Sequence, residues 1–152
     1  MIKIILEIIG KIFSSKVTVE RVSPGDWIPQ EVVRGWVKGL GWEFLGLVYA
    51  PEVWVPMIPD TNSMDGTFDL GNNNILISGE TESDQQKLID RLQVGDIAVY
   101  RNARQYSVHR IIEIGNDTGG KYFIFKGDNN HSPDIDRVRE EEIKWISVGV
   151  IY

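Results

Sequence analysis

The chain has 152 residues, the size of one ordinary domain, and its 42% hydrophobic and 25% charged residues exclude disordered, collagen-like and other repetitive classes. Sixteen Lys and Arg against 22 Asp and Glu leave a net charge of −6, which argues against a dedicated nucleic-acid-binding protein because such proteins present a basic surface. The absence of cysteine excludes disulfides, a thiol nucleophile and a thiolate metal site.

The first segment, Met1 to Phe13, predicts an amphipathic helix. Lys3, Glu7 and Lys11 recur every four residues among Ile, Leu and Phe, which places the charges on one stripe. The segment is too short and too charged to cross a bilayer, and it lacks the cleavage pattern of a secretory signal. We therefore expect it to dock on the domain or on a partner, with membrane contact at most peripheral, in a protein that is soluble or peripherally membrane-associated.

The next elements are a helix and then mainly strands. A turn at Ser23 to Asp26 precedes apolar residues at helical spacing from Val32 to Leu40. Tyr49 to Pro59 alternates and contains prolines, so it is expected to be extended. Ser78 to Asp90 is polar and predicts a surface loop or short helix. Five further strands are predicted at Ile75 to Ile77, Ile97 to Arg101, Ser107 to Ile114, Tyr122 to Lys126, and Ile146 to Tyr152.

Together these elements predict an α+β fold with two parts. Residues 1–48 form a small helical segment that packs on or docks the domain. Residues 49–152 form a mainly antiparallel coiled β-sheet or partly open barrel.

Ser63, His109, Asp128 and Asp134 are side chains of the types that a serine hydrolase uses. A serine hydroxyl is a weak nucleophile and needs an adjacent base, such as a neutral imidazole, to accept its proton. Of the two histidines, His109 lies in a strand-like run, whereas His131 lies in an Asn-Asn-His-Ser-Pro turn and is expected to be solvated. Asp128 or Asp134, hydrogen-bonded to the other ring nitrogen, would fix the tautomer of the base.

In these segments and in their order, the chain resembles the type I signal peptidases, specifically the archaeal and endoplasmic-reticulum branch that uses histidine where bacterial enzymes use lysine. Asn62 to Phe68 is similar to the Ser-Met-x-Pro-Thr box that holds the nucleophile. Gly95 to Arg101 and Val108 to Ile112 resemble the Gly-Asp-Ile-Val-Val-Tyr strand and the Val-His-Arg-Val-Ile strand. Lys126 to Asn130, with Asp134 after it, matches the Lys-Gly-Asp-Asn-Asn box and its second aspartate.

The resemblance covers about two thirds of the chain, from Val53 to its end, and it implies a signal peptidase and LexA-like fold with serine endopeptidase activity. Ser63 would be the nucleophile and His109 the general base. In the family both aspartates matter: Asp134 is preferred here as the imidazole partner and Asp128 as a brace for the loop, although the spacing leaves this choice open.

The resemblance also suggests where substrate would bind. An extended peptide would add as a strand beside Val53 and Val55, next to Met64, with small side chains near the cut. The backbone N–H of Ser63 and the hydroxyl of Thr61 are the expected donors to the oxyanion. The chain departs from the family pattern in two positions. Gly66 stands in place of the proline of the first box, and Asn72 replaces the aspartate of the following Gly-Asp turn.

No cofactor and no metal are expected. The oxygen-bearing residues from Asp128 to Asp136 alternate like a calcium loop, but Pro133 stands where such a loop needs glycine and Arg139 where it needs a bidentate glutamate. The expected partner is an extended peptide or protein substrate, not a nucleic acid, and homo- or hetero-oligomers stay open.

Two other functions remain compatible with the sequence. One is a catalytically silent structural or interaction module with the same fold, for example in a virus particle or a secretion machine. The other is a self-cleaving regulator of the LexA type, for which Ala50 offers a small residue. Those regulators use a lysine base, and no basic helix-turn-helix is visible in this chain.

Overall fold

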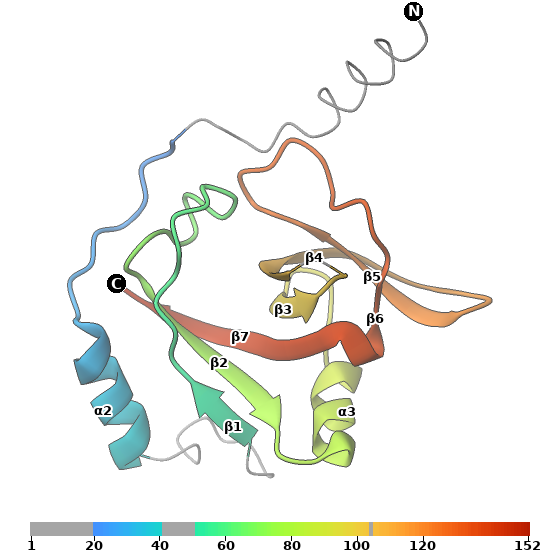
Figure 1. Cartoon of the computed structure of the whole chain (residues 1–152), viewed down its shortest axis with the longest axis horizontal. Coiled ribbons are helices and arrows are strands. Elements are labelled where there is room, and N and C mark those ends of the chain that lie inside the picture. Colours follow the sequence, from blue (N-terminus) through green and yellow to red (C-terminus); the bar gives the residue numbers. More distant parts are fainter. Residues whose placement is uncertain (1–19, 41–50, 104) are drawn as a thin grey trace, which may run out of the picture.

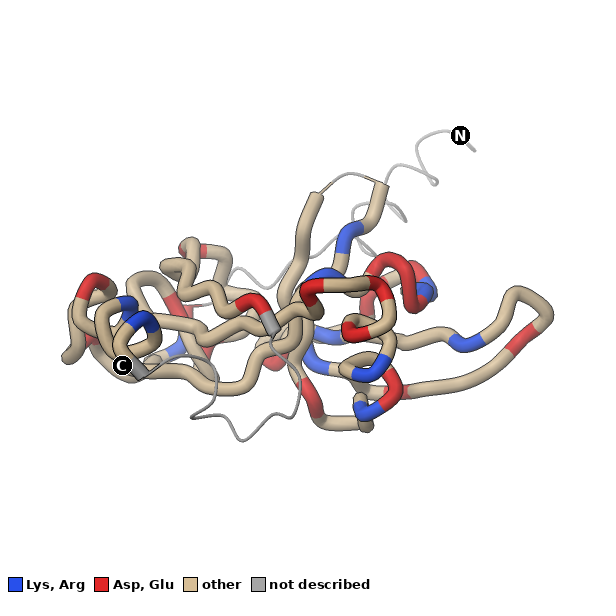
Figure 2. Tube along the Cα trace, turned by 90° about the horizontal axis from the view of Figure 1, so that it is seen from below, with Lys and Arg blue, Asp and Glu red and all other residues tan. Residues whose placement is uncertain are grey.

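The computed structural model describes residues 20–40, 51–103 and 105–152. In this part of the chain, one antiparallel sheet is flanked by two α-helices (Figure 1). The helix predicted at Met1 to Phe13 and the alanine at position 50 lie outside the described residues. Acidic and basic positions are interspersed along the described trace (Figure 2).

The sheet has seven strands in the order β1-β2-β7-β3-β4-β5-β6 and does not close into a barrel. The coarse prediction of an α+β fold with a mainly antiparallel sheet is therefore confirmed. The two-residue strand β6 was not predicted, because so short a run carries no alternating pattern. The strand bounds are β1 Pro51–Trp54, β2 Asn73–Gly79, β3 Ile97–Arg101, β4 Tyr106–Asp117, β5 Gly120–Lys126, β6 Val138–Arg139 and β7 Ile143–Ile151.

Helix α2 (Gln30–Leu40) buries Val33 against Val55 and against Ile75 of β2, with Val37 packed beside them. The predicted buried face is only partly confirmed, because Val32 and Trp36 are exposed. Helix α3 (Glu82–Asp90) occupies the second half of the segment predicted as a surface loop or short helix, and Thr81 caps it by accepting the N–H of Asp84 at 3.1 Å. A short 3₁₀ turn, η2 (Glu140–Glu142), precedes β7. No helix in the described ranges is long and apolar enough to cross a membrane.

Besides the cluster of Val33, Val55 and Ile75 under α2, the described core has a main cluster and a second one under the Ser63 turn. The main cluster packs Leu88 and Ile89 of α3 against the sheet, including Phe123 and Phe125, which are fully buried. The second cluster is formed by Ile58, Met64 and Phe68, with Ile97, Val108 and Val150 packed against it. This second cluster fastens the Ser63 turn to the sheet through apolar contact.

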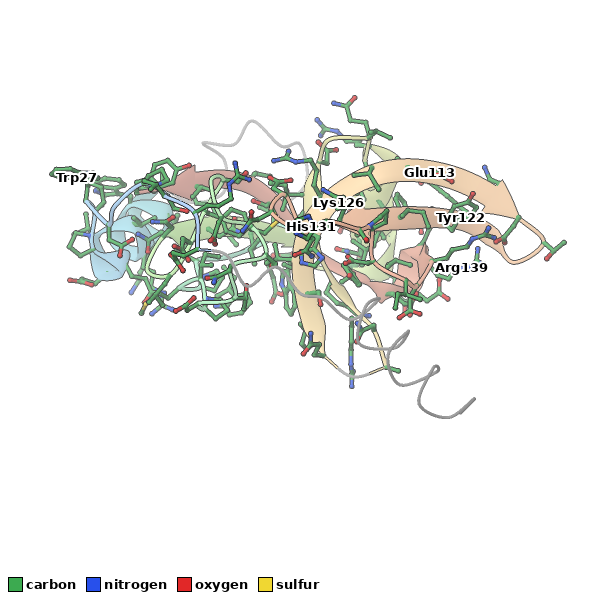
Figure 3. The ribbon with its side chains drawn as sticks, turned by 90° about the horizontal axis from the view of Figure 1, so that it is seen from above. Trp27, Glu113, Tyr122, Lys126, His131 and Arg139 are labelled. Atoms are coloured by element: carbon green, nitrogen blue, oxygen red, sulfur yellow. The ribbon has the colours of Figure 1, made fainter. Side chains whose placement is uncertain are left out.

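Strands β4 and β5 form a long hairpin that carries His109 near one end. The pairing continues as far as Asp117 and Gly120, so the predicted turn from Gly115 to Gly120 is narrower than expected and contains two residues. Gly120 has a φ of 97°, a conformation that glycine adopts without strain. At the far end of this hairpin, Tyr122 donates to Glu113 at 2.8 Å (Figure 3).

Candidate active site

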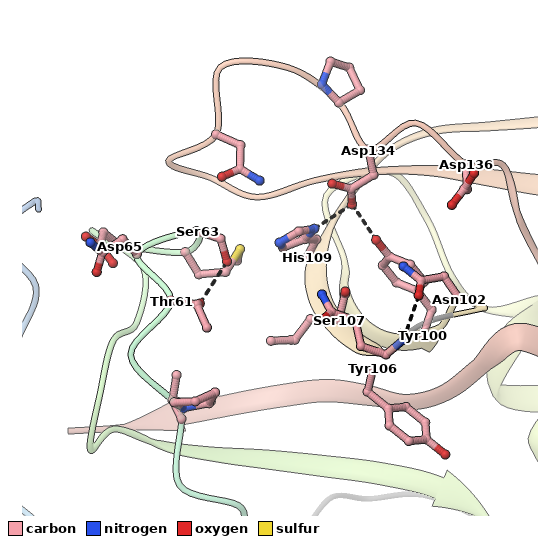
Figure 4. Close-up of a pocket in the computed structure, with 18 of the residues that line it drawn as sticks. Thr61, Ser63, Asp65, Tyr100, Asn102, Tyr106, Ser107, His109, Asp134 and Asp136 are labelled. Atoms are coloured by element: carbon pink, nitrogen blue, oxygen red, sulfur yellow. Dashed lines mark hydrogen bonds and ion pairs between the residues drawn. The ribbon is translucent and has the colours of Figure 1, made fainter. Parts of the chain in front are cut away.

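A cavity of about 450 Å³ lies between the Ser63 turn, the start of β4 and the loop after β5 (Figure 4). Ser63, His109 and Asp134 all line it, together with Thr61 and Tyr100. These residues are separated by up to 73 positions in the sequence, and the antiparallel sheet gathers them at one place.

The loop after β5 holds the Ser63 turn through its backbone. The carbonyl of Ser63 accepts the N–H of Asn129 at 3.0 Å, and the carbonyl of Asn62 accepts the Asn129 side-chain amide at 2.9 Å. Asn62 has a φ of 56°, which asparagine tolerates better than most residues. The hydroxyls of Ser63 and Thr61 lie 3.2 Å apart. The Ser63 side chain is therefore presented beside a second hydroxyl donor.

Both departures from the signal peptidase pattern have a structural reason. Gly66 has a φ of 88° and donates its N–H to Ser23 Oγ at 3.0 Å, and proline could satisfy neither condition. Asn72 is fully buried, and its amide nitrogen donates to Asp26 at 2.7 Å while its oxygen accepts the N–H of Asp69 at 2.8 Å. An aspartate at position 72 would lack the donor.

His109 is oriented by Asp134. The Nδ1 atom of His109 lies 2.6 Å from Asp134 Oδ2, and both side chains are largely buried. The ring lies between Ser63 and Asp134, with its other edge toward Ser63 (Figure 4). In the described residues, Ser63 Oγ bonds to Thr61 and not to the ring.

Tyr100 donates to the same carboxylate oxygen, Asp134 Oδ2, at 2.6 Å. Burial, and next the hydrogen bond to Asp134, raises the pKa of the Tyr100 hydroxyl above its ordinary value. The hydroxyl therefore stays protonated and remains a donor. Sequence reasoning missed this residue, although the hairpin register could have suggested it: Tyr100 pairs with Ser107 and Ala98 with His109, which puts Tyr100 and His109 on one face.

Asp128 does not contact the imidazole. It accepts two hydrogen bonds from Arg110, at 2.8 and 2.6 Å, and one from Thr67. Burial alone would raise the pKa of Asp128, but the hydrogen bonds from Arg110 and Thr67 outweigh it and hold the pKa below its ordinary value. The carboxylate thus ties β4 to the Ser63 turn.

Of the three other residues predicted to bind substrate, only Met64 lines the cavity. Met64 lines the cavity but is only 2% exposed, and its sulfur accepts the N–H of Asp128 at 3.4 Å. Val53 and Val55 are not among the cavity residues, because they pack into the core clusters; the cavity wall before Ser63 is formed instead by Ile58 and Pro59.

Two further details concern the loop after β5. His131 is exposed in its turn, as expected (Figure 3). The carboxylates of Asp128 and Asp134, which resembled part of a calcium loop in the sequence, are paired with Arg110 and His109.

No protein-family model, curated protein or solved structure matches this chain. The geometry of the site therefore has to support any functional assignment by itself.

Proposed function

We propose that the chain is a serine endopeptidase of the signal peptidase type, with Ser63 as nucleophile, His109 as general base and Asp134 as the group that orients the base. The observation that carries the proposal is the 2.6 Å contact between His109 Nδ1 and Asp134, on a ring whose other edge faces Ser63 (Figure 4). A carboxylate on one ring nitrogen leaves the other nitrogen free to accept a proton, which is the arrangement a serine nucleophile requires.

The proposed reaction follows from these positions. Ser63 Oγ attacks the carbonyl carbon of the substrate while its proton passes to His109. The oxyanion is stabilised by the N–H of Ser63 and the hydroxyl of Thr61, which lies 3.2 Å from Ser63 Oγ. His109 then gives its proton to the leaving amine, and water hydrolyses the acyl-enzyme by the reverse sequence.

The cavity supports an extended peptide as the substrate. One wall is the start of β4, where Tyr106 to His109 pair with β3 but not with β5, so an extended peptide has backbone partners along this edge. Ile58, Phe68 and Val108 make part of the wall apolar. Small apolar side chains next to the scissile bond are the proposed preference.

A mixture of synthetic decapeptides, analysed by mass spectrometry after incubation with the full chain, tests the proposal. Cleavage is expected next to small residues and should disappear in Ser63→Ala. Ser132→Ala is the matched control, because Ser132 is an exposed serine that lines the same cavity. Equal cleavage by wild type and Ser63→Ala would contradict the proposal.

A non-catalytic peptide-binding module is the second candidate. The hydrogen bond of Ser63 Oγ to Thr61, rather than to His109, favours it. This candidate predicts that wild type binds decapeptides from the mixture without cleaving any of them. The self-cleaving alternative receives no such support, since the described residues of the cavity wall include no lysine to act as base.

A further inference from the structure

Three carboxylates converge on the side of the Ser63 turn that meets the N-terminal part of the described chain. Glu20, Asp65 and Asp69 each offer one oxygen, and these three oxygens lie within 4.8 Å of one another. In the described ranges, no Lys, Arg or His forms a salt bridge with any of the three. The cluster therefore concentrates negative charge that no described side-chain ion pair offsets.

Asp65 provides the second and independent observation. It is only 2% exposed, and its Oδ1 has no hydrogen-bond partner among the described residues. Its other oxygen, Oδ2, accepts the backbone N–H of Arg21 at 3.0 Å. A buried carboxylate oxygen without a donor is costly, and such groups are usually paired or coordinate a metal ion.

The surroundings of the cluster favour a cation. Asp69 keeps a local contact, since its Oδ1 accepts the N–H of Leu70 at 2.6 Å. The guanidinium of Arg21 instead donates to Asn129 at 3.3 Å.

We propose that Glu20, Asp65 and Asp69 form a calcium site that joins the segment before α2 to the Ser63 turn. All three donors are hard carboxylate oxygens, and His and Cys are absent from the group, which disfavours zinc. Oxygens on opposite sides of Ca²⁺ are about 4.6 to 5.2 Å apart, whereas Mg²⁺ holds them at about 4.0 to 4.2 Å. Oxygens that all lie within 4.8 Å of one another are close enough to share one Ca²⁺, which also tolerates a less regular shell than the near-octahedral one that Mg²⁺ requires. Water would complete the coordination shell.

The position of the site gives the ion a structural consequence. The segment that carries Glu20 already contacts the Ser63 turn through Ser23, whose hydroxyl accepts the N–H of Gly66 at 3.0 Å. It contacts the start of β2 through Ile28, whose carbonyl accepts the side-chain amide of Asn73 at 2.8 Å. A bound ion adds a cross-link between this segment and the residues that follow Ser63. The site does not depend on the peptidase proposal.

Calcium titration of the full chain, after removal of metal with a chelator, tests this proposal. We expect 1:1 binding in calorimetry with a Kd of about 10⁻⁵ to 10⁻³ M, and a rise in Tm of at least about 3 °C at saturating Ca²⁺. Mg²⁺ at the same concentration should raise Tm much less. Ca²⁺ that leaves Tm unchanged and releases no binding heat would overturn the proposal, as would an equal response to Mg²⁺.

Matched variants locate the ion. Asp65→Asn should weaken Ca²⁺ binding at least tenfold, yet leave Tm in chelator unchanged or higher, because a buried charge is removed while the Arg21 N–H keeps an acceptor. Glu20→Gln, at an exposed position, should weaken binding as well. Glu80→Gln, on the exposed connection between β2 and α3, should bind like wild type. Unchanged affinity in both Asp65→Asn and Glu20→Gln would overturn the assignment of the site.

Discussion

His109 and Asp134 come from different strands and loops, 25 positions apart in the chain, and they meet at 2.6 Å through Nδ1 and Oδ2. Tyr100 reaches the same Oδ2 atom at 2.6 Å. Two donors on one carboxylate oxygen hold the aspartate in a single orientation, and the aspartate in turn limits rotation of the imidazole. The orientation of the candidate base is therefore set by the sheet and does not depend on a bound substrate.

The first prediction concerns the two histidines. If His109 is the general base, His109→Ala should lower kcat/KM for decapeptide cleavage by about 10²-fold or more, since general-base catalysis contributes about 10²- to 10⁴-fold. His131→Ala should change it less than about twofold, because that side chain is exposed outside the cavity. Peptide cleavage rates for both variants, with Tm as a check on folding, decide the matter. Equal losses in the two variants would remove His109 from this role.

The second prediction concerns Tyr100 as a positioning residue. Tyr100→Phe removes one hydrogen bond to Asp134 and should cost about 1 kcal/mol in the free energy of unfolding. It should lower kcat about 3- to 30-fold with little change in KM, because the substrate is not contacted through this hydroxyl. Tyr122→Phe is the matched control, since it removes a tyrosine hydrogen bond to Glu113 far along the hairpin. A fall in kcat of similar size in the control would show that the effect is general destabilisation.

Much of the fold could be predicted from the sequence because its elements carry strong local patterns. The strand Ile97–Arg101 was predicted with its observed bounds, and the helix predicted from Val32 begins two residues earlier, at Gln30. Ser63, His109 and Asp134 of the candidate site were also singled out by sequence motifs in a fixed order. These patterns reflect local secondary-structure preference and the burial of apolar side chains, and both agree with the observed elements.

The remaining features depend on contacts between distant segments. Neither the choice between Asp128 and Asp134 nor the role of Tyr100 can be read from spacing, because both follow from strand register and loop path. The placement of Val53 and Val55 in the core was missed because an alternating edge segment looks the same whether its apolar face meets peptide or protein. The burial of Asp65 beside Glu20 was missed because the two residues are 45 positions apart, and no local pattern relates them.

A third prediction concerns the pair formed by Arg110 and Asp128. Because the pKa of Asp128 is lowered in the folded chain, the pair stabilises the fold above the ordinary carboxyl pKa of about 3.9, and this contribution is lost as pH falls through the lowered value. Arg110→Met should therefore cost about 1 to 2 kcal/mol at pH 7, at the low end because Arg110 is partly exposed.

Denaturant unfolding of this variant at several pH values checks the sign. The difference from wild type should shrink below about pH 4. Arg91→Met, at an exposed residue that ends α3, is the control and should cost less than about 0.5 kcal/mol at every pH. A difference that stays constant down to pH 2 would mean that Arg110 stabilises the fold through packing and not through the carboxylate.

The last prediction concerns the close approach between the loop after β5 and the Ser63 turn. A Cβ added at Gly127 would lie 2.5 Å from the carbonyl oxygen of Ser63 and 2.7 Å from the amide nitrogen of Asn130. Since one of these is a backbone atom, the clash can be relieved only if the Ser63 turn and the loop after β5 move apart. Gly127→Ala should cost about 1 to 3 kcal/mol in stability, and it should lower peptide cleavage by more than the loss of folded protein explains.

Gly35→Ala is the control: nothing lies within 4 Å of its added Cβ on α2, so it should stabilise the chain by about 0.5 to 1 kcal/mol. Urea unfolding and cleavage assays on both variants give the comparison. If Gly127→Ala cleaves peptides like wild type at full folding, the position of the Ser63 turn does not matter for activity.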